Sequence, residues 1–227
     1  MKPEIIQTQG WHLATLWNWD YQDAWDFQKQ TVERVRDTNE KWLIACSHPD
    51  VLTHGRGLQK PKKGQSFELE DFKPQVYPAL PVPFFQIERG GGLTFHHPGQ
   101  LILYPIVKLH PQRLGLSALV DNLLLSVRAA LEERGLQNLD HSRELLGLWQ
   151  GPRKLASVGI AVNKMVTMHG LALNVERFDH LKQKLAFLAP CGMGVGTYTS
   201  VEEISGRKIA PPDLVGEVTR RFFHAWE

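Results

Sequence analysis

Residues 89–100 of the sequence are Arg89-Gly90-Gly91-Gly92-Leu93-Thr94-Phe95-His96-His97-Pro98-Gly99-Gln100, and the apolar run 101–107 follows them. Because the apolar residues 84–87 precede this stretch, the sequence predicts a strand, a glycine-rich turn and a second strand in succession. Three consecutive glycines permit positive φ angles and let a ligand approach the backbone without meeting a Cβ atom. No Gly-Lys-Ser/Thr follows, so the stretch lacks the pattern of a phosphate-binding P-loop. Locally, the glycines are consistent with a plain hairpin turn and also with one wall of a binding site.

The composition is that of a globular protein. With 227 residues, 42% of them hydrophobic, the chain can bury a sizeable core, and we expect a single domain over residues 1–227. The formal net charge of +2 is small and the basic residues are scattered, which argues against a nucleic-acid partner. The sequence has neither an apolar run long enough to span a membrane nor an apolar signal segment at its start, so no membrane association is expected. Cys46 and Cys191 lie far apart without a disulfide pattern, which is typical of a reducing, cytoplasmic location.

Hydrophobic patterning predicts the elements of the first part of the chain. A short first strand is expected at residues 5–12, and Asp20 is expected to cap a helix whose apolar stripe is interrupted by Gln28. Residues 42–46 have the pattern of a buried strand, and turn-forming residues fill 48–57.

The second part of the chain begins with the clearest amphipathic helix. Ser117 is its expected N-cap, and Gly135 stands where a C′ residue belongs. Residues 155–162 then predict a strand with one face of mostly small side chains. This strand is expected to turn at Asn163-Lys164 into a return strand over 165–175.

The last third alternates short helices with turns. A short helix is expected at 179–188, Ser200 and Glu203 form a capping-box pattern, and residues 211–213 open a final helix. Helices and strands mix without regular βαβ alternation. The predicted fold class is therefore α+β.

Few residues have the chemistry of a catalytic group. Cys191 lies in a Pro-Cys-Gly turn, where its thiol is expected to be accessible, whereas Cys46 lies in an apolar strand and is interpreted as a core residue. A cysteine nucleophile requires a neighbouring base or cation that favours the thiolate, and the candidates are Lys154, His169, His96 and His97. Taken singly, a lysine is more often a solvated side chain and a histidine in a strand a packed one, so neither residue alone indicates a catalytic role.

A metal site is not expected. His96 and His97 are adjacent, so on a strand their side chains point to opposite faces and do not readily ligate one ion. The sequence contains neither a His-Glu-x-x-His nor a Cys-x-x-Cys motif.

Four motifs, in this order, resemble those of the lipoyl(octanoyl) transferase family. The first comprises Arg89-Gly90-Gly91, Thr94-Phe95-His96, Pro98-Gly99-Gln100 and Tyr104-Pro105, the second Lys154-Leu155-Ala156-Ser157-Val158-Gly159, the third His169-Gly170-Leu171-Ala172-Leu173-Asn174 and the fourth Pro190-Cys191-Gly192. The resemblance extends over residues 42–205, the motif-bearing core. One such motif is weak, but four in the family's order are specific.

The resemblance implies a fold, an activity and partners. The implied fold is the α+β catalytic domain of lipoate and biotin protein ligases, a mixed sheet flanked by helices. The implied activity is transfer of an octanoyl group from octanoyl-acyl carrier protein to a lysine of a lipoyl domain, the first step of endogenous protein lipoylation. The implied acceptors are the lipoyl domains of 2-oxo-acid dehydrogenases and the glycine cleavage H protein.

The resemblance also assigns residue roles. Cys191 is the implied acyl-thioester nucleophile, and Lys154 its partner, which lowers the thiol pKa and shuttles protons. The implied substrate-binding residues are Arg89, Gly90, Gly91, Gly92, Leu93, Thr94, Phe95, His96, Ser157, Val158, Gly159, Gly170, Leu171 and Ala172, with His169 as a possible addition. No cofactor is needed, because exchange between thioesters is close to isoenergetic and formation of the amide is downhill. The small strand face would accommodate a straight acyl chain, each buried methylene of which contributes roughly 0.8 kcal/mol.

The sequence departs from the family pattern in two places. His97 stands where the family's motif has glycine, which adds an imidazole near the expected site. Residues 58–82 are longer and more basic than expected, with Lys60, Lys62 and Lys63 among several prolines. They are interpreted either as a solvated loop or as a docking edge for an acidic carrier protein.

Two other functions remain open at this point. An ATP-dependent lipoate or biotin protein ligase would activate a free acid and would not need a nucleophilic cysteine. The Pro-Cys-Gly turn, and a chain length that leaves no room for an accessory domain, make this function less expected. A non-catalytic module that binds acyl groups or carrier proteins would tolerate loss of Cys191 or Lys154, and both residues are present.

Overall fold

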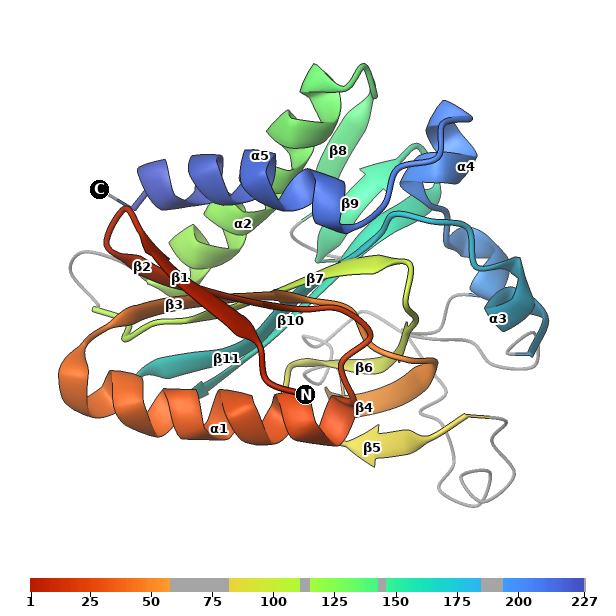
Figure 1. Ribbon diagram of the computed structural model, residues 1–227. Helices are drawn as coiled ribbons and strands as arrows, with labels where there is room; N and C mark the ends of the chain where they lie inside the picture. Colours follow the sequence, from red (N-terminus) through yellow and green to blue (C-terminus); the bar gives the residue numbers. More distant parts are fainter. Residues whose placement is uncertain (58–81, 111–114, 143–145, 185–193, 227) are drawn as a thin grey trace, which may run out of the picture.

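The computed structural model describes residues 1–57, 82–110, 115–142, 146–184 and 194–226. Their main feature is an eight-stranded sheet, shown in Figure 1, with the strand order β1-β2-β3-β7-β11-β10-β9-β8. These strands are β1 (Glu4–Thr8), β2 (Trp11–Leu16), β3 (Lys41–Cys46), β7 (Gln100–Ile106), β11 (Val166–Asn174), β10 (Arg153–Asn163), β9 (Gly147–Gln150) and β8 (Leu139–Ser142). Within it β2 and β3 are parallel and the other neighbours antiparallel, so the predicted mixed sheet is confirmed.

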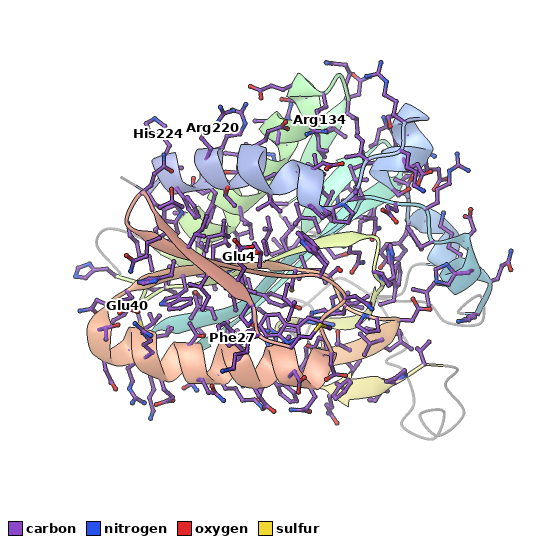
Figure 2. All side chains as sticks on the ribbon, viewed as in Figure 1. Glu4, Phe27, Glu40, Arg134, Arg220 and His224 are labelled. Carbon is purple, nitrogen blue, oxygen red and sulfur yellow. The ribbon has the colours of Figure 1, made fainter. Side chains whose placement is uncertain are left out.

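Helices cover both faces of this sheet (Figure 1). Helix α1 (Tyr21–Thr38) packs on one face, and α2 (Leu116–Glu133) and α5 (Pro212–His224) pack on the other. Strand β7 is buried along its whole length, because its side chains alternate between the two layers. Leu101 and Leu103 join the α2–α5 layer, whereas Ile102 and Tyr104 join the α1 layer. The α+β class is thus confirmed, and Figure 2 shows the side chains that fill both layers.

A second sheet of three strands has the order β5-β4-β6. It contains β5 (Phe84–Gln86), β4 (Val51–Gly57) and β6 (Gly91–His96), with β4 in the middle. The two strands predicted on either side of the glycine-rich stretch are confirmed as β5 and β7, but Gly91–His96 form a further strand where a turn was expected. Because β4 lies between β5 and β6, these two strands do not form a hairpin. Residues 51–57, expected as a turn, form the central strand. The sequence of this strand lacks an alternating apolar pattern, because its glycines and polar side chains pack against the segment around Arg89 instead of an apolar layer.

Three short helical segments complete the described chain. They are α3 (Asp179–Lys184), the 3-10 turn η3 (Val195–Thr197) and α4 (Val201–Ser205). The end of the predicted helix 179–188 and nearly all of the basic segment 58–82 lie outside the described residues. None of the helices in the described ranges is long and apolar enough to cross a membrane.

The predicted caps and turns are partly confirmed. Asp20 accepts a hydrogen bond from the Asp23 amide at 3.1 Å, and Ser200 accepts one from the Glu203 amide at 3.1 Å, as the capping patterns predict. Gly135 has a φ of +90° just after α2. The N-cap of α2, however, is Gly115, so Ser117 lies inside the first turn.

Two hairpins, β1–β2 and β10–β11, have turns at positions that the sequence analysis did not predict. The expected strand 5–12 is two strands, β1 and β2, joined by Gln9 and Gly10 at φ angles of 49° and 72°. The turn between β10 and β11 consists of Lys164 and Met165, at 48° and 66°, one residue later than predicted. Both φ pairs suit the type I′ geometry that matches strand twist. Only Gly10 among the four residues favours such angles intrinsically, which explains why the pattern was hard to recognise.

Candidate active site

A narrow pocket lies between the three-stranded sheet, the middle of the large sheet and the start of α1. It is lined by Tyr21, Arg89, Thr94, His96, Tyr104, Ser157, Val158, Gly159, His169, Gly170, Leu171 and Ala172. The lining unites residues from three separate motifs of the sequence, and all but Tyr21 and Tyr104 were predicted site residues. The structure therefore brings together the segments that the sequence pattern had grouped.

The remaining predicted residues near this segment do not line the pocket. The Gly90 amide donates a hydrogen bond to the carbonyl of Ile160 at 3.2 Å, which joins the glycine-rich segment to β10. Gly91 has a φ of +82°, Gly92 is buried in β6, and Leu93 packs in a hydrophobic cluster. Phe95 lines a smaller adjoining cavity, which shares Thr94, Ser157 and Ala172 with the pocket. These residues shape the wall behind the pocket.

Arg89 is a buried cation at the base of the pocket, only 6% exposed. Its Nη2 donates hydrogen bonds to the carbonyl and the hydroxyl of Thr53, at 2.9 and 2.8 Å, and its Nη1 donates to the Gly90 carbonyl at 3.0 Å. A Cβ atom on Gly159 would lie 2.9 Å from Arg89 Cδ, so glycine is required where this segment crosses β10. Charge-assisted bonds of this kind offset the cost of burying the guanidinium.

His96 is held by a chain of side-chain amides. Gln100 Nε2 donates to Asn174 Oδ1 at 2.9 Å, and Asn174 Nδ2 donates to the Thr199 carbonyl at 2.9 Å. The Gln100 Oε1 atom therefore faces His96 Nδ1, 3.1 Å away, and accepts its proton in a hydrogen bond. Nε2 of His96 is left as the acceptor nitrogen. Burial, first, and the neighbouring His48 and Arg89 hold the pKa of His96 well below its usual range, so the ring is neutral near pH 7.

Tyr104 is oriented by a second buried histidine, His48. The His48 Nδ1 atom donates to the Trp19 carbonyl at 2.8 Å, so its Nε2 accepts the Tyr104 hydroxyl proton at 3.0 Å. Burial lowers the pKa of His48 to about 4. The predicted turn around His48-Pro49 thus supplies a support for the pocket that the sequence reasoning did not assign.

His169 occupies an unusual backbone conformation within β11. Its φ is +61°, a region that non-glycine residues rarely adopt and that costs about 1–3 kcal/mol. Its amide donates to Gln28 Oε1 of α1 at 2.9 Å. Its side chain is 2% exposed, and Nε2 lies 3.9 Å from Glu88 Oε2, within ion-pair range but too far for a hydrogen bond. Burial lowers the pKa of His169, so this ring is also neutral near pH 7.

Gly170 lets β11 approach β7 at the floor of the pocket. A Cβ atom at this position would lie 2.0 Å from the Leu103 carbonyl oxygen and 2.8 Å from Pro105 Cδ. The glycine of the third motif is therefore required for strand packing, whatever the pocket binds.

Comparison with known proteins agrees with this geometry. The sequence model described as lipoyl protein ligase A/B catalytic domain matches residues 20–223. An octanoyltransferase of Alkaliphilus metalliredigens is 34% identical over 198 residues, which cover 86% of this chain and 85% of that protein. The chain belongs to the lipoyl protein ligase A/B family, among its octanoyltransferases. A chloroplastic octanoyltransferase of Arabidopsis thaliana is 30% identical and covers 89% of this chain and 74% of its own length.

Solved structures place this octanoyltransferase-family chain in the expected fold. A bipartite lipoate protein ligase from Thermoplasma acidophilum superposes with a TM-score of 0.65 over 94% of this chain and 82% of that chain, at 12% identity. A lipoate-protein ligase A bound with ATP gives a TM-score of 0.64 over 88% of this chain and 81% of that chain, also at 12% identity. The predicted relation to the ligase catalytic domain is thereby confirmed at the level of the fold.

Of the two residues expected to be catalytic, the structure describes Lys154 but not Cys191. Lys154 is 5% exposed, lies on β10 with its Nζ 5.2 Å from the centre of the Trp149 ring, and does not line the pocket. Cys191 lies outside the described residues. The Thr199 amide donates a hydrogen bond to the Lys154 carbonyl at 3.0 Å. Thr199, eight residues after Cys191 in the sequence, is therefore held against β10 at Lys154.

His97, the departure from the family motif, lines neither the pocket nor the adjoining cavity. Its ring is buried and stacks on Phe178, with the ring centres 4.7 Å apart. Burial lowers its pKa to about 4. In this octanoyltransferase the extra imidazole therefore packs against the segment before α3 instead of adding a polar group to the pocket.

Proposed function

We propose that this chain transfers an octanoyl group from octanoyl-acyl carrier protein to a lysine of a lipoyl domain. The carrying observation is the pocket, which gathers residues of the first three motifs in a chain of the octanoyltransferase family. The proposed acceptors are lipoyl domains of 2-oxo-acid dehydrogenases and the glycine cleavage H protein. The proposed substrate-binding residues are those of the pocket together with the glycine-rich wall from Gly90 to Phe95.

The proposed chemistry proceeds in two steps. In the first, the Cys191 thiolate attacks the carbonyl carbon of the octanoyl thioester, a new C–S bond forms, and the carrier's thiolate leaves. In the second, an acceptor amine attacks the enzyme thioester, a C–N bond forms, and the Cys191 thiolate leaves. Lys154 is proposed to favour the Cys191 thiolate by its charge and to protonate the leaving thiolate of the first step. No ATP is consumed, because the acyl group arrives already activated.

The pocket has the properties that such an exchange requires. Its imidazoles are neutral near pH 7, and its walls are glycine-rich strand edges where backbone amides can approach a developing oxyanion. The aliphatic and small side chains of Val158, Leu171 and Ala172 provide apolar surface for an acyl chain. The tautomer of His96 leaves Nε2 as an acceptor, 3.4 Å from the Thr53 hydroxyl.

The decisive experiment is intact-mass analysis after mixing the protein with octanoyl-acyl carrier protein in the absence of ATP. We expect one octanoyl mass on the wild type and on Cys46→Ala, since Cys46 is fully buried and burial raises the pKa of its thiol. No adduct is expected on Cys191→Ser, and Lys154→Ala should form it about 100-fold more slowly. An adduct that survives Cys191→Ser unchanged contradicts the proposal, and a requirement for ATP with free octanoate would indicate a ligase instead.

A further inference from the structure

The edge strand β1 is the least covered strand of the large sheet. It lies at one end of the strand order (Figure 1) and, within the described ranges, pairs with β2 alone. Its first four residues are exposed, and two of them are the large apolar residues Ile5 and Ile6, at 47% and 48% exposure. The other edge strand, β8, carries Asp140 and His141, polar residues that discourage pairing with a further strand. β1 has no such residue at its centre.

The outer side of β1 presents backbone groups that β2 does not use. Thr8 and Trp11 flank the two-residue turn of the β1–β2 hairpin, so they exchange both hydrogen bonds, and bonded and non-bonded pairs alternate from there. Ile6 is therefore bonded to β2, whereas the amides and carbonyls of Ile5 and Gln7 point away from it. In the described part of the chain, no backbone hydrogen bond outside the hairpin engages these groups.

A second copy of the chain fits this edge, because the edge is complementary to itself. When two β1 strands lie antiparallel with Ile6 opposite Ile6, the outward groups of Ile5 in each copy meet those of Gln7 in the other. Each of the two Ile5–Gln7 pairs then exchanges two hydrogen bonds. The isoleucines on the two-fold axis form a non-hydrogen-bonded pair, the kind in which opposite side chains lie closest. Such a pairing closes on itself and leaves no open β1 edge.

Charge also favours a second copy as the partner. In this register Glu4 of one copy lies opposite Thr8 and diagonal to Gly10 of the other. Lys41 lies at that turn, since its Nζ is 3.8 Å from the position of a Cβ atom on Gly10 and 5.3 Å from the centre of the Trp11 ring. Glu4, Thr8 and Trp11 share the α2–α5 face of the sheet, so the carboxylate and the ammonium meet on one face.

Within a single copy both of these charges are available. No salt bridge among the described residues engages Glu4 or Lys41. The two-fold axis brings the opposite charges together twice, and it places no like charges directly opposite each other.

We propose that β1 is the interface of a homodimer, in which two copies join their large sheets through antiparallel β1 strands centred on Ile6. A strand of five residues buries less area than the roughly 1,000 Å² of a stable interface, so the dimer is weak and forms at high concentration. β2, β3 and β7 separate β1 from β11, so each copy keeps its own pocket. This inference does not depend on the proposed function.

Sedimentation velocity of the purified chain between about 5 and 500 µM tests the dimer. We expect the sedimentation coefficient to rise from that of a monomer to that of a dimer over this range. Ile6→Lys should raise the dissociation constant about tenfold or more, because the axis places the two new charges directly opposite each other. Leu125→Lys is the matched control, since Leu125 is 46% exposed on α2, and this variant should dimerise like the wild type.

A mixing experiment tests the register. Ile6→Lys and Ile6→Glu each repel their own copies, but an equal mixture of the two places opposite charges across the axis. We expect native mass spectrometry of the mixture to show heterodimers in at least about tenfold excess over either homodimer.

A second pair of variants tests the backbone bonds. Gln7→Pro removes an outward amide and no bond to β2, so it should raise the dissociation constant about tenfold or more. Gln7→Thr keeps that amide and should change the dissociation constant less than about threefold. Urea denaturation shows that each variant is folded, and octanoyl transfer per chain should be equal in the wild type and Ile6→Lys.

Three results would overturn the proposal. A wild type that stays monomeric at about 500 µM would leave the edge to a strand of another protein. A dimer that neither Ile6→Lys nor Gln7→Pro weakens would have its interface elsewhere. Growth beyond the dimer that Gln7→Pro abolishes would mean that the edge adds strands without closing on a two-fold axis.

Discussion

At the scale of the residue, Gly170 shows how a motif position can be required for packing. A Cβ atom there would lie 2.0 Å from the Leu103 carbonyl oxygen, a separation that forces β11 away from β7. We expect Gly170→Ala to lower the free energy of unfolding by about 1–3 kcal/mol, measured by urea denaturation. Gly90→Ala is the matched control, because its Cβ would meet nothing closer than the Ile160 carbonyl at 3.7 Å. If both variants unfold at the same urea concentration, the close approach of the strands is not what selects glycine at 170.

The pocket residues that belong to family motifs were predictable from the sequence, whereas the residues that contact and orient them were not. Ser157, Gly159 and Gly170 could be assigned because a family pattern names them. Glu88 and Tyr21 carry no local signal of their own, since their contacts depend on how two sheets and a helix meet. Gln28 did leave a signal, because a polar residue inside an apolar stripe needs a buried partner.

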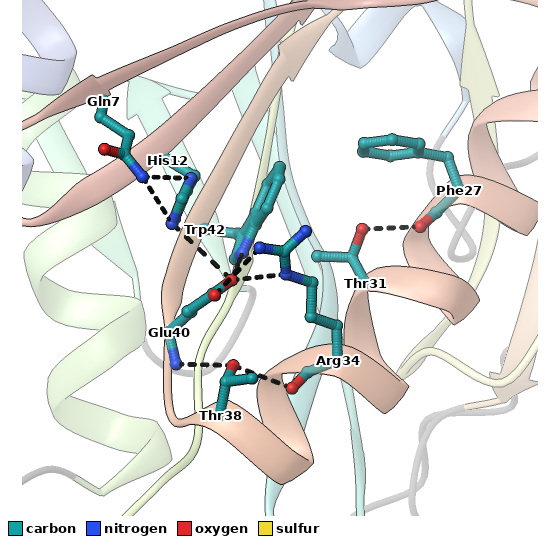
Figure 3. A network of polar contacts seen from close by, with 8 residues as sticks. All are labelled: Gln7, His12, Phe27, Thr31, Arg34, Thr38, Glu40 and Trp42. Carbon is teal, nitrogen blue, oxygen red and sulfur yellow. Dashed lines mark hydrogen bonds and ion pairs between the residues drawn. The ribbon is translucent and has the colours of Figure 1, made fainter.

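At the scale of the element, the corner between α1 and β3 is held by Glu40 (Figure 3). Its carboxylate accepts hydrogen bonds from Arg34 Nε at 2.7 Å and from Trp42 Nε1 at 2.9 Å. The bond from Arg34, first, and that from Trp42 lower the pKa of Glu40 below its ordinary value. Because Arg34 is 54% exposed and the network is screened by solvent, we expect Glu40→Gln to cost only about 0.5–1 kcal/mol near pH 7.

The pH dependence of that cost has a definite sign. A carboxylate whose pKa is depressed in the folded state stabilises the fold above its unfolded pKa, about 4.3 for glutamate. The stabilisation is lost as the pH falls through the lower, folded pKa. The difference in unfolding free energy between wild type and Glu40→Gln should therefore be full near neutral pH and shrink in acid. Urea denaturation of both proteins at neutral pH and in acid measures this difference. A difference in unfolding free energy that grows in acid would contradict the role assigned to Glu40.

At the scale of the whole molecule, the fold class was predictable and the strand order was not. Periodicity identified α1, α2, α5 and the buried strands, because each follows its own local pattern. The placement of β11 between β7 and β10, and of β4 between β5 and β6, depends on pairings between distant segments. Such pairings are set by packing of the complete sheet and leave no local pattern. The pocket forms where the two sheets meet, so the glycine-rich stretch and the family motifs indicated some of its residues in advance but not its position.

The chain's two ends are joined by an aromatic cluster on the α2–α5 side of the large sheet. Trp11 of β2 stacks on Phe223 at 4.9 Å between ring centres and contacts Phe222 at 5.2 Å. Because Phe222 is fully buried, we expect Phe222→Ala to lower the free energy of unfolding by about 3–5 kcal/mol. Octanoyl transfer per folded molecule should stay unchanged, since neither Trp11 nor Phe222 lines the pocket. Urea denaturation together with single-turnover transfer below the transition tests both parts. A loss of transfer in fully folded Phe222→Ala would show that this layer is coupled to the pocket through the sheet.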